Sequence, residues 1–124
     1  LRRLFKGRKY TISNIYFYGN SPVVLPKSKA TLKKLYEIMK NNKTMKIRIE
    51  GHTNGVGTFN SASYHQELSD NRAKTVYRYL LNRDISPGRI SSVGYGCSRM
   101  VFPKAVNEYQ MSLNRRVEIV ILDY

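Results

Sequence analysis

The sequence is poor in cysteine and contains no tryptophan. One cysteine, Cys97, stands among 124 residues. A single cysteine excludes an internal disulfide, so a disulfide-stapled secreted fold is ruled out, whereas the cytoplasm and a bacterial periplasm both remain compatible. No activating partner lies beside it in the sequence, so we expect Cys97 to be a bystander rather than a nucleophile.

Acidic residues are also scarce. There are 8 Asp and Glu against 22 Lys and Arg, which gives a formal net charge of +14. Such a charge favours anionic partners, whether nucleic acid, lipid head groups or another anionic polymer. The basic residues are dispersed, with modest concentrations over 1–9 and 27–48. We expect no nucleic-acid partner, because no RNP, zinc-finger or helix-turn-helix pattern accompanies the charge.

Long apolar runs are missing as well. None approaches the roughly 20 residues that a membrane-spanning helix needs. The opening residues, LRRLFKGRKY, include neither an initiator Met nor an apolar signal region, so we expect a domain cut from a longer protein. The length and the apolar fraction of 41% fit one globular domain with its own core.

The residue sets that catalysis requires are absent too. Glycoside cleavage needs two facing carboxylates, and Glu50, Glu67 and Asp70 show no such pairing. The two histidines, His52 and His65, have no carboxylate at a metal-ligand spacing. No Ser-His-acid set or glycine-rich phosphate loop is present. We therefore expect no enzyme activity, no metal and no cofactor.

The first half of the chain predicts a strand followed by a helix. Residues 1–9 are basic and aperiodic, which indicates a lead-in or linker before a domain spanning 10–124. Alternating apolar residues predict a strand over 10–18. Apolar residues spaced three and four apart predict an amphipathic helix over 26–42, and its lysines fall mostly off the apolar stripe.

The middle of the chain repeats this order. Strict alternation over 45–50 predicts a strand with Met45, Ile47 and Ile49 inward and Lys46, Arg48 and Glu50 outward. Ser63 and Gln66 have the spacing of a capping box, which predicts that a second helix starts there and runs to about Asn82. A loop rich in Gly, Asn and Ser joins the two elements.

Two strands complete the predicted fold. The first lies near 89–95, a long loop then runs through 114, and alternation over 116–122 predicts the second. The order β-α-β-α-β-β predicts an α/β (α+β) two-layer sandwich, with two helices on one face of a four-stranded mixed sheet. The other face of the sheet should be partly wet.

Three separated motifs give this pattern a family resemblance. They are GHTN at 51–54, LSDNRA at 68–73 and NRRVEI at 114–119. Any one of them is weak, but together with the element order they are specific. From about residue 10 to its end the chain resembles the OmpA-like C-terminal domain, found in OmpA, the peptidoglycan-associated lipoprotein and MotB.

The resemblance implies a cell-wall anchor. Domains of this family bind peptidoglycan non-covalently through the diaminopimelate residue of its stem peptide. The expected partners are thus peptidoglycan and other cell-envelope proteins, in the periplasm, with tethering to the outer membrane through an N-terminal part outside this sequence. Similar domains occur in flagellar stators and in secretion-system lipoproteins, including one of the type IX machinery.

The resemblance also implies the two main ligand contacts. In the family an Asp ends the first motif and contacts the ammonium, while the Arg of the second motif contacts a carboxylate. These positions are Asn54 and Arg72 here, and Arg72 is expected in the first turns of its helix, near the backbone donors of the N-terminus. A neutral Asn54 should weaken ammonium binding by about 1–2 kcal/mol unless Glu50, Glu67 or loop carbonyls compensate.

Four more residues complete the expected site. By resemblance, Asn20 and Arg115 line the same cleft, Leu68 offers packing and a backbone contact, and His65 replaces a family Asn. Strand alternation turns only one of Arg115 and Arg116 toward the loop side; with Arg115 assigned to the cleft, Arg116 is expected to be a structural or surface charge. The plainer alternatives are a solvated Arg72 with an i,i+4 partner, and asparagines that only satisfy loop backbone.

A second function stays open from the sequence. A degenerate domain of this fold could act as a basic protein-interaction module, or bind nucleic acid or lipid head groups through its charge. Steep salt dependence would indicate that function, whereas saturable and stereospecific muropeptide binding would indicate the cell wall.

Overall fold

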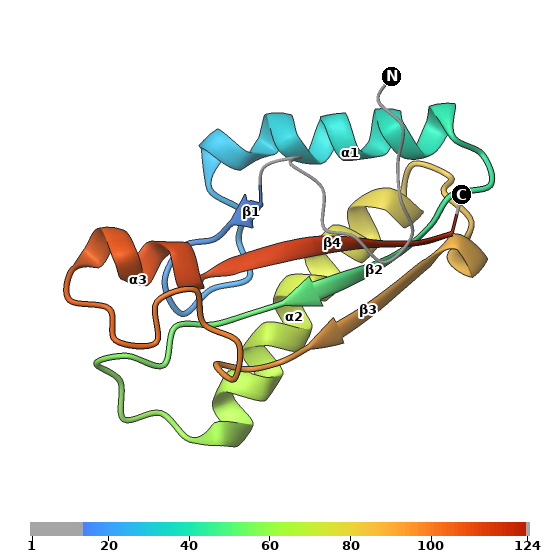
Figure 1. Ribbon diagram of the computed structural model, residues 1–124. Helices are drawn as coiled ribbons and strands as arrows, with labels where there is room; N and C mark the ends of the chain where they lie inside the picture. Colours follow the sequence, from blue (N-terminus) through green and yellow to red (C-terminus); the bar gives the residue numbers. More distant parts are fainter. Residues whose placement is uncertain (1–13, 124) are drawn as a thin grey trace.

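The computed structural model describes residues 14–123 (Figure 1). The predicted lead-in over 1–9 and the first residues of the strand predicted over 10–18 lie outside this range. The elements in chain order are β1 (Ile15–Tyr16), η1 (Pro26–Ser28), α1 (Lys29–Asn41), β2 (Lys46–Gly51), α2 (Ala62–Leu81), η2 (Pro87–Arg89), β3 (Ile90–Gly94), α3 (Glu108–Asn114) and β4 (Arg116–Asp123).

The four strands form one mixed sheet in the order β1-β4-β2-β3. The neighbours β2 and β3 are parallel, while β4 runs antiparallel to both β1 and β2. Figure 1 shows α1 and α2 against the sheet, so the predicted α+β sandwich is confirmed. In the described part of the chain, no helix has both the length and the apolarity needed to cross a bilayer.

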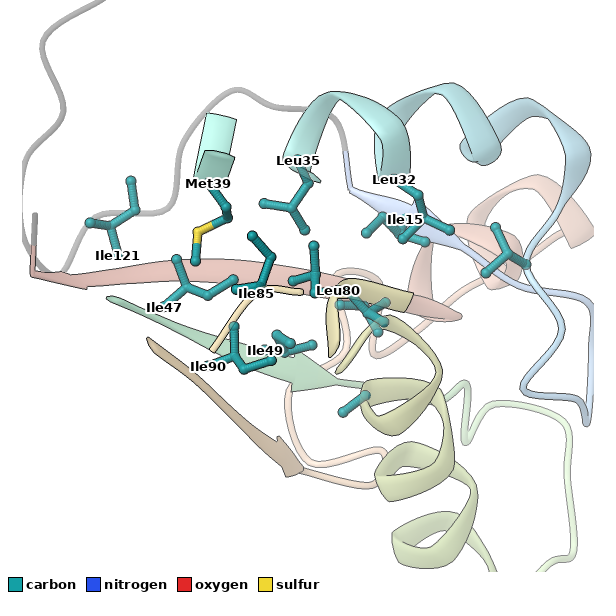
Figure 2. Close-up of a cluster of buried hydrophobic side chains, with 14 of the residues drawn as sticks. Ile15, Leu32, Leu35, Met39, Ile47, Ile49, Leu80, Ile85, Ile90 and Ile121 are labelled. Carbon is teal, nitrogen blue, oxygen red and sulfur yellow. The ribbon is translucent and has the colours of Figure 1, made fainter. Parts of the chain in front are cut away.

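The core lies between the sheet and the two long helices (Figure 2). Every second residue of the strands points into it, and the helices contribute residues spaced three or four apart. The alternation and the helical stripes predicted from the sequence place these side chains correctly. The buried residues that show it are Ile15, Phe17, Leu32, Leu35, Met39, Met45, Ile47, Ile49, Ala73, Val76 and Leu80.

The predicted start of the second helix is wrong by two residues. Ser61, not Ser63, is the N-cap of α2, and its side chain accepts a hydrogen bond from the Tyr64 amide at 3.2 Å. The two serines satisfy the same local rule for an N-cap, so short-range pattern could not choose between them.

The sequence prediction missed α3, which lies inside the loop expected up to 114. The Asn107 side chain caps it by accepting from the Gln110 amide at 2.9 Å. In return, Gln110 Oε1 accepts from the Val106 amide at 2.8 Å. This reciprocal arrangement resembles a capping box, so the signal was present as Asn-x-x-Gln. The helix ends at Asn114 and places Arg115 immediately after it.

The second face of the sheet is partly wet, as predicted, but it is dry around Glu50 and Glu118. Glu50, expected to point into water, is 1% exposed, and Glu118 on the neighbouring strand is 8% exposed. Arg48 Nε lies 3.0 Å from Glu50, and Arg116 Nε lies 2.8 Å from Glu118, so each carboxylate has a cation on its own strand. Arg116 also donates to the Arg99 carbonyl at 2.8 Å, which fastens the loop after β3 over this face.

Candidate functional site

The predicted site residues meet in one pocket of about 140 Å³. The turn after β1, the loop after β2, one face of α2 and the α3–β4 junction form its walls, and Figure 1 shows these segments at the same end of the molecule. The six residues expected there all line it: Asn20, Asn54, His65, Leu68, Arg72 and Arg115. A volume this small suits one amino acid head group, because drug-sized ligands occupy roughly 300–1,000 Å³.

Helix α2 supplies three of the lining residues. His65, Leu68 and Arg72 lie three and four residues apart, so they share one face of the helix. Arg72 lies ten residues after Ala62, which is about 15 Å along the helix axis. The expectation that it lies beside the helix N-terminus is therefore wrong, because that distance removes the N-terminal amides from its reach.

Arg72 is a buried structural arginine that also faces the pocket. It is 1% exposed. Its Nε, Nη1 and Nη2 atoms each donate to a backbone carbonyl at 3.0 Å, those of Ser21, His52 and Tyr18 respectively. The alternative of a solvated helix arginine is thus wrong. A guanidinium has five N–H groups, so two of them, one on each terminal nitrogen, make no hydrogen bond to the described residues.

The pocket brings a second guanidinium close to the first. Burial, and then the charge of Arg115, lower the pKa of Arg72 to about 10, while Tyr64 acts in the opposite direction. Arg72 is still protonated at neutral pH. Arg115 donates to both oxygens of Glu108 at 2.6 and 3.0 Å, and this pairing lowers the pKa of Glu108. The pocket therefore has a positive wall that is only partly neutralised.

Asn54 is held by the protein at both ends of its amide. Its Oδ1 accepts from Asn114 Nδ2 at 2.9 Å and from the Val56 amide at 3.4 Å, while its Nδ2 donates to the Val56 carbonyl at 2.8 Å. The carbonyl expected to face an ammonium thus already has two donors. Glu50 and Glu67, suggested as compensating acceptors, do not line the pocket.

Asn20 and His65 are fixed in the same way. Asn20 has a φ of 53°, which asparagine tolerates better than most residues, and its Oδ1 accepts from the Tyr64 hydroxyl at 2.9 Å. The His65 ring lies between two hydroxyls, with Thr53 Oγ1 2.8 Å from Nδ1 and Thr58 Oγ1 3.2 Å from Nε2. These contacts attach the loop after β2 to α2.

Several of these supporting residues were not predicted from the sequence. Thr53 and Asn114 belong to the first and third motifs, so their position beside Asn54 and Arg115 was a usable signal. Glu108 lies outside the three motifs, and the helix that carries it was expected to be a loop.

A set of possible metal ligands lies outside the pocket. Side-chain atoms of Glu50, His52 and Glu118 lie within 4.8 Å of one another, and all three residues are buried. Both carboxylates are already paired with guanidiniums, those of Arg48 and Arg116. The donor set therefore fits a buried ion-pair network better than a cation site.

Comparison with known proteins agrees with the motifs. Residues 16–115 match the OmpA family. The chain belongs to this family. Outer membrane porin F of Pseudomonas aeruginosa is 41% identical over 106 residues, covering 85% of this chain and 29% of the porin. The peptidoglycan-associated lipoprotein of Buchnera aphidicola is 34% identical over 120 residues, covering 97% of this chain and 64% of the lipoprotein. This chain thus spans under a third of the porin and about two thirds of the lipoprotein.

Solved structures of the family have the same fold. The peptidoglycan-associated lipoprotein of Burkholderia pseudomallei superposes with a TM-score of 0.77 at 26% identity, covering 87% of this chain and 88% of the lipoprotein. The C-terminal domain of Helicobacter pylori MotB gives a TM-score of 0.75 at 25% identity, covering 90% and 85%. The membership inferred from three short motifs is confirmed.

Replacing Arg72 should destabilise the fold. Arg72→Ala leaves three backbone carbonyls without their donor, so the free energy of unfolding should fall by about 3–5 kcal/mol in urea denaturation. Arg78→Ala removes an exposed arginine from the same helix and should change the free energy of unfolding by less than about 0.5 kcal/mol. Equal stability of the two variants would contradict the anchoring role of Arg72.

His65 should make stability depend on pH. Burial, and then the charge of Arg72, lower the pKa of His65 below its ordinary 6.5. Below about pH 6.5 the unfolded chain therefore binds more protons at this residue than the folded chain does, so stability falls as the pH falls through that window. His65→Gln should remove this part of the slope in urea titrations between about pH 7.5 and 5. His52 is present in both proteins, so identical slopes would exclude the contribution of His65.

Proposed function

We propose that this domain binds peptidoglycan non-covalently through the diaminopimelate residue of the stem peptide. One observation carries the proposal: the buried Arg72, which has two N–H groups without a hydrogen bond to the described residues, lines a pocket that Arg115 also lines. The end of diaminopimelate that lies outside the peptide backbone is a zwitterion, with a carboxylate and an ammonium on one carbon. A pocket of this size and charge suits such a head group.

The carboxylate of the ligand would sit against Arg72. A guanidinium can hold a carboxylate through two parallel N–H bonds, and such charge-assisted bonds are about twice as strong as neutral ones. Three protein contacts already fix the Arg72 side chain, so binding would immobilise little further freedom. An anion between Arg72 and Arg115 would also relieve the repulsion that helps to lower the pKa of Arg72.

The ammonium of the ligand would face weaker hydrogen-bond acceptors than the donors that face its carboxylate. Oxygens of Asn20 and Asn54 carry only partial charge and already accept bonds from the protein. Glu108 is the carboxylate bonded to a lining residue, and it is 71% exposed, so it can contribute negative charge near the mouth of the pocket. We expect carboxylate recognition to contribute more affinity than ammonium recognition.

Binding of this kind would make the domain an anchor. We propose a periplasmic location, with the rest of a larger protein tethering the domain to the outer membrane and to other envelope components. The names of its relatives, an outer membrane porin and a peptidoglycan-associated lipoprotein, support this location. No catalytic step is part of the proposal, so we propose a binding domain and not an enzyme.

A second candidate function is charge-driven binding to an anionic polymer. The observation that favours it is the exposed face of α1, which carries Lys29, Lys33, Lys34 and Lys40 against a single Glu37. Lys33 therefore provides a charge-matched control for the pocket.

Removing the charge of Arg115 should weaken ligand binding specifically. Arg115→Gln should lower the affinity for a diaminopimelate stem peptide about tenfold in calorimetry, through loss of carboxylate attraction. Lys33→Gln removes the same charge outside the pocket and should stay within about twofold in about 0.15 M salt. Wild type should also prefer this peptide to one with lysine in place of diaminopimelate, because lysine lacks the second carboxylate.

Sedimentation with intact sacculi tests the same pair of variants. Equal losses for Arg115→Gln and Lys33→Gln, together with steep salt dependence, would replace the pocket with the basic surface as the binding element. Absence of saturable stem-peptide binding by the wild type would refute the proposed ligand.

Restoring a carboxylate at position 54 should strengthen ammonium recognition at the expense of loop stability. In Asn54→Asp, one oxygen keeps the bond from Asn114, but the other faces the Val56 carbonyl that the amide now contacts. We expect about tenfold tighter binding of the diaminopimelate peptide and about 1 kcal/mol lower unfolding free energy. A peptide whose side-chain ammonium is acetylated should show no gain. Unchanged affinity for the diaminopimelate peptide would mean that its ammonium does not bind near position 54.

A further inference from the structure

Three aromatic side chains stand out by their exposure. Tyr18, Phe59 and Tyr109 are 47%, 106% and 71% exposed, whereas every other aromatic side chain in the described part of the chain is buried or half-buried. Exposed rings gathered in one region mark recognition surfaces more often than chance.

All three rings belong to segments that form the pocket. Tyr18 directly precedes the lining residue Gly19, and Phe59 directly follows the lining residue Thr58. Tyr109 lies in α3, whose C-terminal end leads into Arg115. Figure 1 shows the loop between β2 and α2 at the same end of the molecule as α3. The three rings therefore lie on the segments that form the pocket walls, but none of them lines the pocket itself.

The neighbours of the rings indicate which kind of partner they would contact. Phe59 stands between Thr58 and Asn60, and Tyr109 stands between two further polar residues, Glu108 and Gln110. A continuous apolar partner surface would strip water from these polar groups without pairing them, which is unfavourable. A pyranose ring fits better, because its C–H face packs on an aromatic ring while its hydroxyl and acetamido groups bond to polar neighbours.

We infer that Tyr18, Phe59 and Tyr109 form a glycan subsite at the mouth of the pocket. It takes the sugar rings to which the stem peptide is joined, and in this form it rests on the proposed function. Two residues separate diaminopimelate from the sugar, and they span about 7 Å or more when extended. With the diamino acid in the pocket, this linker is long enough for the first sugar to contact the segments that carry the exposed rings.

Calorimetry with three ligands tests the subsite: a diaminopimelate stem peptide, the same peptide on its disaccharide, and the disaccharide alone. Wild type should bind the disaccharide-peptide about tenfold more tightly than the free peptide. The Phe59→Ala/Tyr109→Ala variant should lose this difference and keep its affinity for the free peptide within twofold. Both side chains are exposed, so the thermal unfolding midpoint should not change.

Leu122→Ala is the matched control. Leu122 is 39% exposed on β4, six residues beyond Arg116 and thus about 20 Å along the strand from the end that faces the pocket. It should leave the affinities for all three ligands unchanged.

The outcomes separate the subsite from the proposed function. Equal wild-type affinity for peptide and disaccharide-peptide would overturn the subsite and leave stem-peptide binding intact. If the double variant binds the disaccharide-peptide as tightly as the wild type does, the subsite is also overturned, and the rings would instead contact a protein partner. Failure of the free peptide to bind, combined with ring-dependent binding of the disaccharide alone, would refute the proposed function and support the subsite. No binding of any ligand would refute both.

Discussion

The geometry of the candidate site depends on the buried guanidinium of Arg72. It joins the turn after β1, the end of β2 and helix α2 through three bonds to backbone carbonyls. Buried carbonyls without a donor are unfavourable, so this side chain fixes the relative positions of three pocket walls. Two N–H groups of the same guanidinium make no hydrogen bond to the described residues, and in the proposed function they would bind the carboxylate. Anchoring and the proposed recognition would thus be coupled in one residue, whose charge is already oriented and largely desolvated.

Charge pairing elsewhere makes this concentration of cations tolerable. Glu108 neutralises Arg115 beside Arg72, and Glu118 neutralises Arg116 on the opposite side of β4. The two adjacent arginines therefore serve different purposes, because Arg115 follows the end of α3 whereas Arg116 is the first residue of β4. Arg115 lines the pocket, whereas Arg116 helps to hold the loop after β3 over the sheet.

Much of the fold could be predicted from local pattern. Alternation in Met45, Ile47 and Ile49 and the helical spacing of Leu32, Leu35 and Met39 identified core faces, because burial follows the period of each element. The prediction failed where the sequence pattern gives no signal or is compatible with more than one structure. The two-residue repeat of a strand shows that Glu50 and Ile49 face opposite sides of the sheet, but it does not show whether another segment covers Glu50.

The sequence by itself determined the order of the strands and the two long helices, the faces that pack into the core and the motif residues that meet in the pocket. Only the tertiary structure decided what those residues do there. Arg72 bonds to carbonyls 20, 51 and 54 residues away, and Asn54 bonds to an amide 60 residues away. Hydrogen bonds over such separations exist only once the chain has folded. They decide how many donors of Arg72 remain for a ligand and why the Asn54 carbonyl is already occupied.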